Sequence, residues 1–333
     1  MTAAEETPPG SVANASAAAG EIWTTLLQHS GRLPQAAIDE VLGPQRGTPA
    51  TERPLPCTFS ADALTGVDCR LPAPVGSAPR GIGTSLSRTR IIGGKVVQGS
   101  AQVLLTGTAD SHRRSWSHYL ARPGVVEVLG EPDVEALGLG LAADRAQVDP
   151  LALGASAKHR IAGVQRSLLL DRRPPFRAAR TRLRWAAVLP SQDTTECRAV
   201  FTLTGESSRS LRVVAAAPDL AAVQRFCEDL AHHDWLLTTL NGALVRGDGR
   251  DDSFERQRTV LEHLLGLWMP GAHTPAPLAV LWSGFERDPG FTRHWESLTG
   301  LVRDRVALHT LALLERMSGE RGRNGAEAPE RQS

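Results

Sequence analysis

The stretches GTSLSRTRII (residues 83–92) and KVVQGSAQVLLTG (residues 95–107) flank the dipeptide Gly93-Gly94 and decide the expected fold. Both stretches carry β-branched residues, with polar and apolar positions interleaved. The tight turns that join antiparallel strands need positive φ angles, which glycine adopts without steric cost. The sequence therefore predicts a β-hairpin centred on the two glycines.

The chain around this hairpin is expected to be rich in strands. We predict further strands at Ile22–Leu27 and Val125–Leu129, and a short helix from Pro132 to Asp144. The proline-rich segment from Pro54 to Pro79 is interpreted as an irregular but ordered loop. Residues 1–20 contain almost no large apolar side chains and are expected to be disordered. Residues 21–148 then form a β-rich domain.

A second pattern begins near residue 149. Pro150 could open a helix that ends at Gln165, because its apolar residues recur at helical spacing. Three strands are predicted to follow, at Leu183–Leu189, Arg198–Thr204 and Leu211–Ala216. From Pro218 to Met317 the apolar residues keep helical spacing almost throughout. We predict an α+β domain over residues 149–318, in which a small antiparallel sheet packs with a C-terminal helix bundle, and a disordered tail over residues 319–333.

Composition excludes several classes of protein. The formal net charge is +1, so no overall charge attracts nucleic acid or an acidic membrane. No apolar run approaches the ~18–20 residues of a membrane span, and the N-terminus does not have the pattern of a secretory signal. The four cysteines form no CxxC pair, which argues against structural zinc. We therefore expect a cytoplasmic protein with reduced cysteines and without a metal or cofactor.

No catalytic motif is recognisable. The chain has neither a P-loop nor a GxSxG elbow, and the glycines of GLGLA (residues 138–142) do not follow a strand. Polar and titratable residues crowd around His112, His118 and Tyr119, where Asp110, Arg113 and Arg114 also lie. If this segment were a strand, the two histidines would share one face about 20 Å apart, too far to share a metal. This cluster remains the candidate site if the protein is an enzyme.

The sequence His232-His233-Asp234 is a second polar cluster. A metal held there needs a third ligand from elsewhere, and the simpler interpretation is a solvated helix face or a break in the helix. Asp234 falls in line with Leu230 and Leu237 on an apolar stripe. It either caps a new helix, the interpretation we favour, or forms a buried ion pair with an arginine from the middle of the chain.

The segment from Lys158 to Arg184 concentrates positive charge. It holds nine lysines and arginines against the single acid Asp171 in 27 residues. The arginines could pair with acids of the C-terminal helices, dock an acidic partner protein, or contact nucleic acid. On a strand, alternate arginines would form one solvent-facing stripe, which favours docking. The candidate binding face comprises Arg172, Arg173, Arg177, Arg180, Arg182 and Arg184.

Several runs of the sequence together resemble one family. They include WSHYLARPGVVEVLG (residues 116–130), RRPPFRAARTRLRWAAV (residues 172–188) and LWMPGAH (residues 267–273). The chain is similar over roughly residues 21–315 to an uncharacterised actinobacterial family, typified by a Streptomyces coelicolor reading frame beside a variant P-loop protein. The resemblance implies no activity and no catalytic residues. It implies an accessory or regulatory protein that works with a P-loop ATPase encoded nearby.

These observations favour a non-enzymatic interaction protein over an enzyme of unfamiliar type. The expected partner is a protein, and the P-loop ATPase is the first candidate. Nucleic-acid binding through the arginine-rich segment is the remaining alternative.

Overall fold

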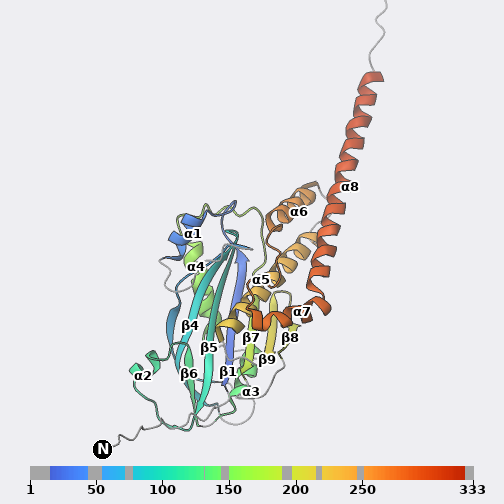
Figure 1. Ribbon diagram of the computed structural model, residues 1–333. Coiled ribbons are helices and arrows are strands. Elements are labelled where there is room, and N and C mark those ends of the chain that lie inside the picture. Colours follow the sequence, from blue (N-terminus) through green and yellow to red (C-terminus); the bar gives the residue numbers. More distant parts are fainter. Residues whose placement is uncertain are drawn as a thin grey trace, which may run out of the picture.

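The computed structural model describes residues 16–43, 55–71, 78–130, 132–143, 150–189, 197–214, 220–245 and 251–326. One mixed nine-stranded sheet runs through the molecule, with helices on both faces (Figure 1). The α+β class expected from the sequence is therefore confirmed.

The predicted hairpin forms the centre of the sheet. Strand β4 (Arg80–Ile92) pairs with β5 (Val96–Thr108) in antiparallel register, and Lys95 N–H donates to the carbonyl of Ile92 at 3.0 Å. Gly93 and Gly94 have φ angles of 57° and 66°, the positive values that this turn requires. The far ends of β4 and β5 separate, and β6 (Val125–Leu129) pairs with both strands there.

Strands from both halves of the chain share the sheet. Its order is β2-β4-β6-β5-β1-β7-β9-β8, and β3 pairs with β4. The remaining strands are β1 (Ser16–Leu26), β2 (Cys57–Phe59), β3 (Ala63–Arg70), β7 (Thr181–Leu189), β8 (Arg198–Leu203) and β9 (Ser208–Val214). The pairing of β1 with β7 makes the sheet continuous across residue 148, so the last three strands do not form the separate antiparallel sheet that we expected. Moreover, β7 and β9 run parallel.

Three expectations about irregular segments are wrong. Residues 16–20 belong to β1, where small alanine and glycine side chains fit beneath a helix, and residues 1–15 lie outside the described part. The segment 54–79 contains β2 and β3. The helix α8 continues to Ala326, beyond the tail boundary at residue 319, and residues 327–333 lie outside the described part.

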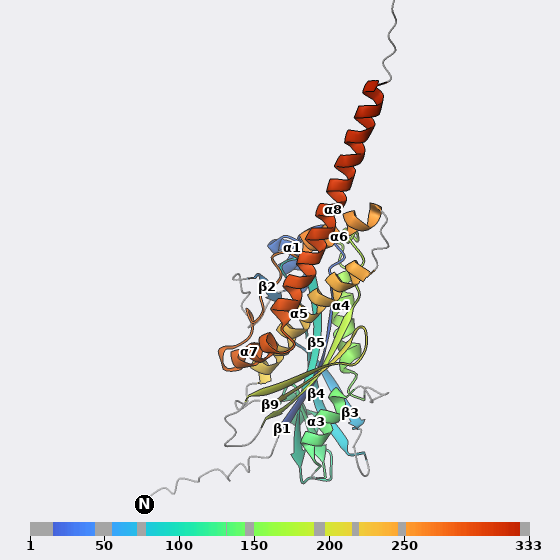
Figure 2. The same ribbon diagram turned by 90° about the vertical axis from the view of Figure 1, so that its right-hand side faces the viewer.

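Helices cover the two faces of the sheet differently. α3 (Val134–Ala142) and α4 (Leu153–Gln165) pack on one face, and α5 (Leu220–Val245) packs on the other. α6 (Asp251–Leu264), the 3₁₀ helix η1 (Ala276–Leu278), α7 (Ala279–Arg287) and α8 (Phe291–Ala326) lie outside α5 (Figure 2). The short helices α1 (Gln35–Leu42) and α2 (Trp116–Leu120) lie at the periphery.

Glycines allow the closest approaches in these layers. A Cβ atom on Gly99 of β5 would lie 2.1 Å from the carbonyl oxygen of Ala157, so α4 rests directly on the backbone of the strand. A Cβ atom on Gly20 of β1 would lie 2.4 Å from the ring of Trp185. The large indole therefore lies flat beneath α5 because its neighbour on β1 has no side chain.

Candidate functional site

The arginine-rich segment is divided between a buried and an exposed part. Strand β7 alternates as predicted, because Leu183 and Trp185 enter the core while Arg182 and Arg184 lie on the opposite face. That face is covered by α3 and α4, so the solvent-facing stripe expected there is wrong for these two arginines. The alternation of arginine and apolar residues along β7 predicts which side chains share a face of the strand. It does not predict whether a helix covers that face.

The acid that satisfies Arg182 and Arg184 comes from the N-terminal strand. Arg182 donates from Nε and Nη2 to the two oxygens of Glu21, both at 2.8 Å, and Arg184 Nε lies 3.4 Å from Oε2. Glu21 is buried and also accepts from the indole N–H of Trp23 at 2.6 Å. The pairing with acids of the C-terminal helices, which the sequence analysis allowed, is therefore replaced here by a pair between β1 and β7.

The remaining members of the predicted binding face stay at the surface. They are Arg172, Arg173, Arg177 and Arg180, all of which are exposed. Arg172 has a φ angle of 58°, and its N–H donates to the carbonyl of Gln28 at 3.0 Å. These four residues precede β7 in an extended segment that contains Pro174 and Pro175. The structure therefore leaves an exposed group of four arginines from the predicted six.

The predicted polar cluster near residue 112 is not a strand. His118 and Tyr119 belong to α2, whereas His112 lies in the exposed loop before it. His118 Nε2 lies 2.8 Å from Oε1 of Glu127, and Arg122 pairs with the same carboxylate. Tyr119 is buried, and its hydroxyl accepts from the N–H of Arg114 at 3.1 Å. The structure therefore joins His118 to an acid that the sequence did not suggest, and it leaves His112 apart from them.

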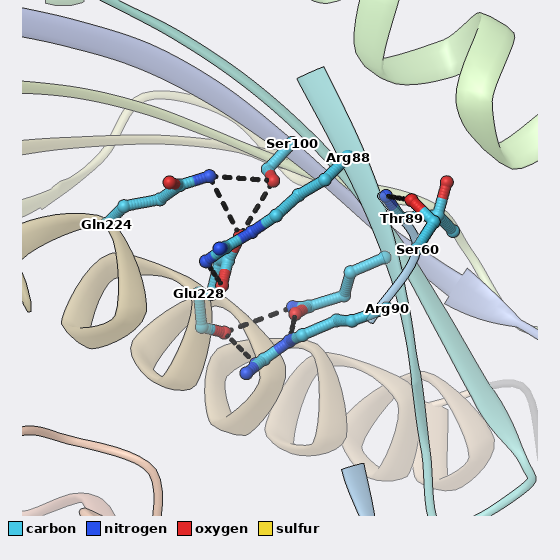
Figure 3. Close-up of polar contacts among 8 residues, drawn as sticks. Ser60, Arg88, Thr89, Arg90, Ser100, Gln224 and Glu228 are labelled. Atoms are coloured by element: carbon cyan, nitrogen blue, oxygen red, sulfur yellow. Dashed lines mark hydrogen bonds and ion pairs between the residues drawn. The ribbon is translucent and has the colours of Figure 1, made fainter. Parts of the chain in front are cut away.

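The centre of α5 is polar although it packs on the sheet. Arg88 of β4 forms a two-pronged ion pair with Glu228, from Nε at 3.0 Å and Nη2 at 2.8 Å (Figure 3). Ser100 and Gln224 donate to Oε1 of the same carboxylate. Arg90 Nη2 donates to the main-chain carbonyl of Glu228 at 2.6 Å, and Arg90 is only 1% exposed.

Electrostatic interactions in this cluster favour the charged forms of Glu228 and Arg88. Burial alone raises the pKa of Glu228, but Arg88 and Arg90, together with the hydrogen bonds, bring that pKa below its usual value. The pKa of Arg88 is raised in turn, because the attraction of Glu228 outweighs the effect of burial. No pattern in the sequence indicates this network, because Arg88 and Glu228 are 140 residues apart and only the tertiary structure brings them together.

His232 and His233 lie on the same helix, one turn further along. Helix α5 runs unbroken through both residues, and both are fully buried, so a solvated face or a helix break is wrong. His233 Nδ1–H donates to the carbonyl of Asp229 at 2.8 Å, and Nε2 accepts from the N–H of Met269 at 3.2 Å. Asp229, His232 and His233 could each offer one atom to a metal ion, and these atoms lie within 4.8 Å of one another.

Asp234 is neither a cap nor a partner of the arginine-rich segment. It lies in mid-helix, and its Oδ1 accepts from Arg209 Nε of β9 at 2.9 Å. Burial raises the pKa of Asp234, and Arg209 offsets this only in part. A buried ion pair was one of the two alternatives left by the sequence, but the arginine belongs to the strand that lies against this part of α5. The pair borders a pocket of about 340 Å³ that Phe201 and Phe291 also line.

The second half of α8 stands away from the rest of the molecule. Trp295, Leu298 and Val302 anchor its first half in the core, and His309 stacks on Phe254 with ring centroids 4.0 Å apart. Beyond this contact the helix projects into solvent (Figures 1 and 2). Its large exposed apolar side chains are Leu301, Leu308, Leu311, Leu313, Leu314 and Met317, which we call the α8 surface.

Among the described residues, no helix combines the length and apolar character needed to cross a membrane. A scan against protein-family models, a search of curated proteins and a search of solved structures each returned no match.

Proposed function

We propose that this protein is a non-enzymatic interaction protein that docks a helix of a partner protein on the α8 surface. The observation that carries the proposal is the projecting half of α8, which bears large apolar side chains in solvent. Leu308 is 67% exposed, and Leu311, Leu314 and Met317 are each more than half exposed. Exposed apolar groups of this size in one place are typical of protein–protein contact sites.

The spacing of these side chains favours a helical partner. Leu308, Leu311, Leu314 and Met317 recur every three residues, so each neighbours the next on the helix surface. Ridges formed in this way pack into the grooves of another helix. An amphipathic helix laid along one side of α8 would cover Leu308, Leu311 and Leu314, as in other helix-recognition interfaces, whereas Met317 lies on the side opposite Leu308.

The exposed arginines offer a second contact for the same partner. Arg172, Arg173, Arg177 and Arg180 can each fork onto a carboxylate, so an acidic segment of the partner would suit them. The resemblance described above makes the P-loop ATPase encoded nearby the first candidate partner. We place the proposed interaction in the cytoplasm.

The experiment compares two variants in a pull-down with the candidate P-loop protein as the named target. The triple variant Leu308→Ser, Leu311→Ser, Leu314→Ser removes the centre of the α8 surface. The control Leu168→Ser changes a leucine in the turn after α4. This leucine is 93% exposed and is far from α8 in the sequence. We expect the triple variant to lose the partner and the control to retain it.

Light scattering on the purified wild-type protein distinguishes two molecules that could cover the α8 surface, namely a different partner protein and a second copy of this chain. A monomer that binds the target supports the proposal. A stable dimer that the triple variant converts to monomer would mean that the α8 surface is covered by another copy of this chain, and the proposal of a heterologous partner would be abandoned. The same follows if the triple variant retains the target as well as the control does.

A further inference from the structure

Three potential metal ligands occupy consecutive turns of α5. Asp229, His232 and His233 are spaced i, i+3 and i+4, which places them on one side of the helix. All three are buried, and Asp229 and His233 accept hydrogen bonds from the segment that follows α6. A carboxylate and two imidazoles are donor groups that suit a divalent transition metal.

Two of these side chains present polar atoms without a hydrogen-bond partner among the described residues. They are Oδ1 of Asp229 and both ring nitrogens of His232. His232 is 0% exposed, so bulk water does not reach it either. Leaving a buried imidazole unsatisfied is costly, and native proteins seldom do so without a ligand or an ordered solvent molecule.

The histidines are in the protonation state that a metal needs. Burial holds the pKa of His232 well below its usual value, and neighbouring His233 and Arg90 lower it further. Burial also lowers the pKa of His233. Both rings are therefore neutral at pH 7, and a neutral imidazole has a lone pair to donate.

We propose that Asp229, His232 and His233 bind a divalent transition-metal ion of the Zn²⁺ type. Asp229 Oδ1 and His233 Nδ1 are 3.5 Å apart. Two ligands of a tetrahedral zinc ion, each about 2.0–2.1 Å from the metal, are separated by about 3.3 Å. This pair already has the separation that the ion requires, and the ligand atoms of all three residues lie within 4.8 Å of one another.

The proton of His233 must move when the metal binds. Nδ1–H now donates to the carbonyl of Asp229, and Nε2 accepts from Met269 N–H. Ligation through Nδ1 transfers the ring proton to Nε2, so the ring stays neutral and both hydrogen bonds are lost. The proposal requires that the bonds between the metal and its ligands outweigh the two hydrogen bonds that are lost. Metal binding is thus coupled to release of the Met269 amide.

Other groups support or limit the site. Thr274 Oγ1–H donates to Oδ2 of Asp229 at 3.0 Å, and Trp282 Nε1–H donates to that threonine oxygen at 2.6 Å, which orients the carboxylate. His273, which also lowers the pKa of His232, has a buried Nε2 without a partner among the described residues. Burial and Arg90 lower the pKa of His273 to about 4, so it too is neutral.

The ligand set decides the class of metal, and Arg90 weakens the binding of any cation. A guanidinium close to the histidines opposes a cation, and only one carboxylate of the proposed set compensates for it. Ca²⁺ and Mg²⁺ depend on several oxygen ligands and are disfavoured here. Zn²⁺ and Co²⁺ gain most from the imidazole nitrogens and are the ions to test.

The test uses the full chain, stripped with a chelator, and titrates it with Zn²⁺ and Co²⁺. We expect one equivalent of metal per chain by elemental analysis, a Co²⁺ absorption spectrum of low coordination number, and a higher melting temperature with Zn²⁺. Asp229→Asn and His232→Gln should each lower the affinity by about 100-fold or more. The control His159→Gln changes an exposed histidine on α4 and should bind as wild type does.

Two further measurements remain informative if a variant of a metal ligand fails to fold. Thr274→Val leaves all three ligands in place and should lower the affinity by about 10–100-fold. Nuclear magnetic resonance of the wild-type imidazoles should show the His233 proton moving from Nδ1 to Nε2 at saturating Zn²⁺. The proposal is overturned if wild type binds no stoichiometric metal, if His232→Gln folds and binds as wild type does, or if the His233 tautomer is unchanged.

Discussion

Two buried carboxylates six residues apart on α5 have pKa values that are shifted in opposite directions. Glu228 faces the middle of the sheet, where Arg88 and Arg90 approach it together with Ser100 and Gln224, and its pKa is lowered. Asp234 faces β9 near the edge of the sheet, where Arg209 is the cation that approaches it, and its pKa is raised. Burial acts in the same direction on both, so the number of cations and hydrogen-bond donors decides the outcome.

The largest effect is expected at Glu228. Glu228→Gln leaves the buried guanidinium of Arg88 without its counter-ion and should lower the free energy of unfolding by about 3–5 kcal/mol, measured by urea denaturation. The double variant Arg88→Met with Glu228→Met is the control, because it removes both charges and should recover much of that loss. A cost below about 1 kcal/mol for Glu228→Gln would show that the ion pair is not a stabilising element.

Asp234→Asn should cost less, about 1 kcal/mol. The amide oxygen of asparagine can still accept the bond from Arg209 Nε, and the charge that is lost was already disfavoured by burial. Arg209 also keeps its bonds to main-chain carbonyls of the turn before β9. Equal costs for Asp234→Asn and Glu228→Gln would contradict the distinction between the two sites.

The dependence of stability on pH should differ in sign between the two carboxylates. The folded pKa of Glu228 lies below the unfolded value, so its contribution is complete above the unfolded pKa and is lost as the pH falls through the folded pKa. The folded pKa of Asp234 lies above the unfolded value, so its contribution becomes more favourable as the pH falls through that window.

Urea denaturation between about pH 6 and pH 3 measures both contributions. Relative to wild type, Glu228→Gln should lose less stability as the pH falls, and Asp234→Asn should lose more. Parallel profiles for the two variants would mean that the folded-state pKa values of both carboxylates are shifted in the same direction.

The smallest effect is expected for the exposed arginines. Arg180→Ser should leave the melting temperature within error of wild type, because this side chain lies at the surface. Arg184→Ser, the matched change on the buried side of β7, removes contacts to Glu21 and Ala143 and should lower the melting temperature clearly. Equal melting temperatures would indicate that the Glu21 cluster contributes no more than a surface ion pair.

The hairpin and most later elements could be predicted because their signals are local. Gly93-Gly94 specifies its turn by conformational preference, and β6 at Val125–Leu129 matches the expected strand. The short helix around His118 has no extended periodicity, so the sequence does not predict it. The expectation of a helix break or a new cap near Asp234 is wrong for a different reason. Arginines of the sheet pair with the buried acids of α5, so the helix continues through these polar residues.

The sequence by itself determined the class of fold, the central hairpin, the alternation of arginine and apolar residues along β7, and the concentration of positive charge before it. These follow from backbone preference and from spacing along the chain. Only the tertiary structure decided which charges meet. Glu21 joins Arg182 and Glu228 joins Arg88 across well over a hundred residues, because pairing of β1 with β7 and packing of α5 on the sheet bring them together. Burial strongly affects the energy of each contact. It depends on how the layers pack against one another, so no single segment of the sequence determines it.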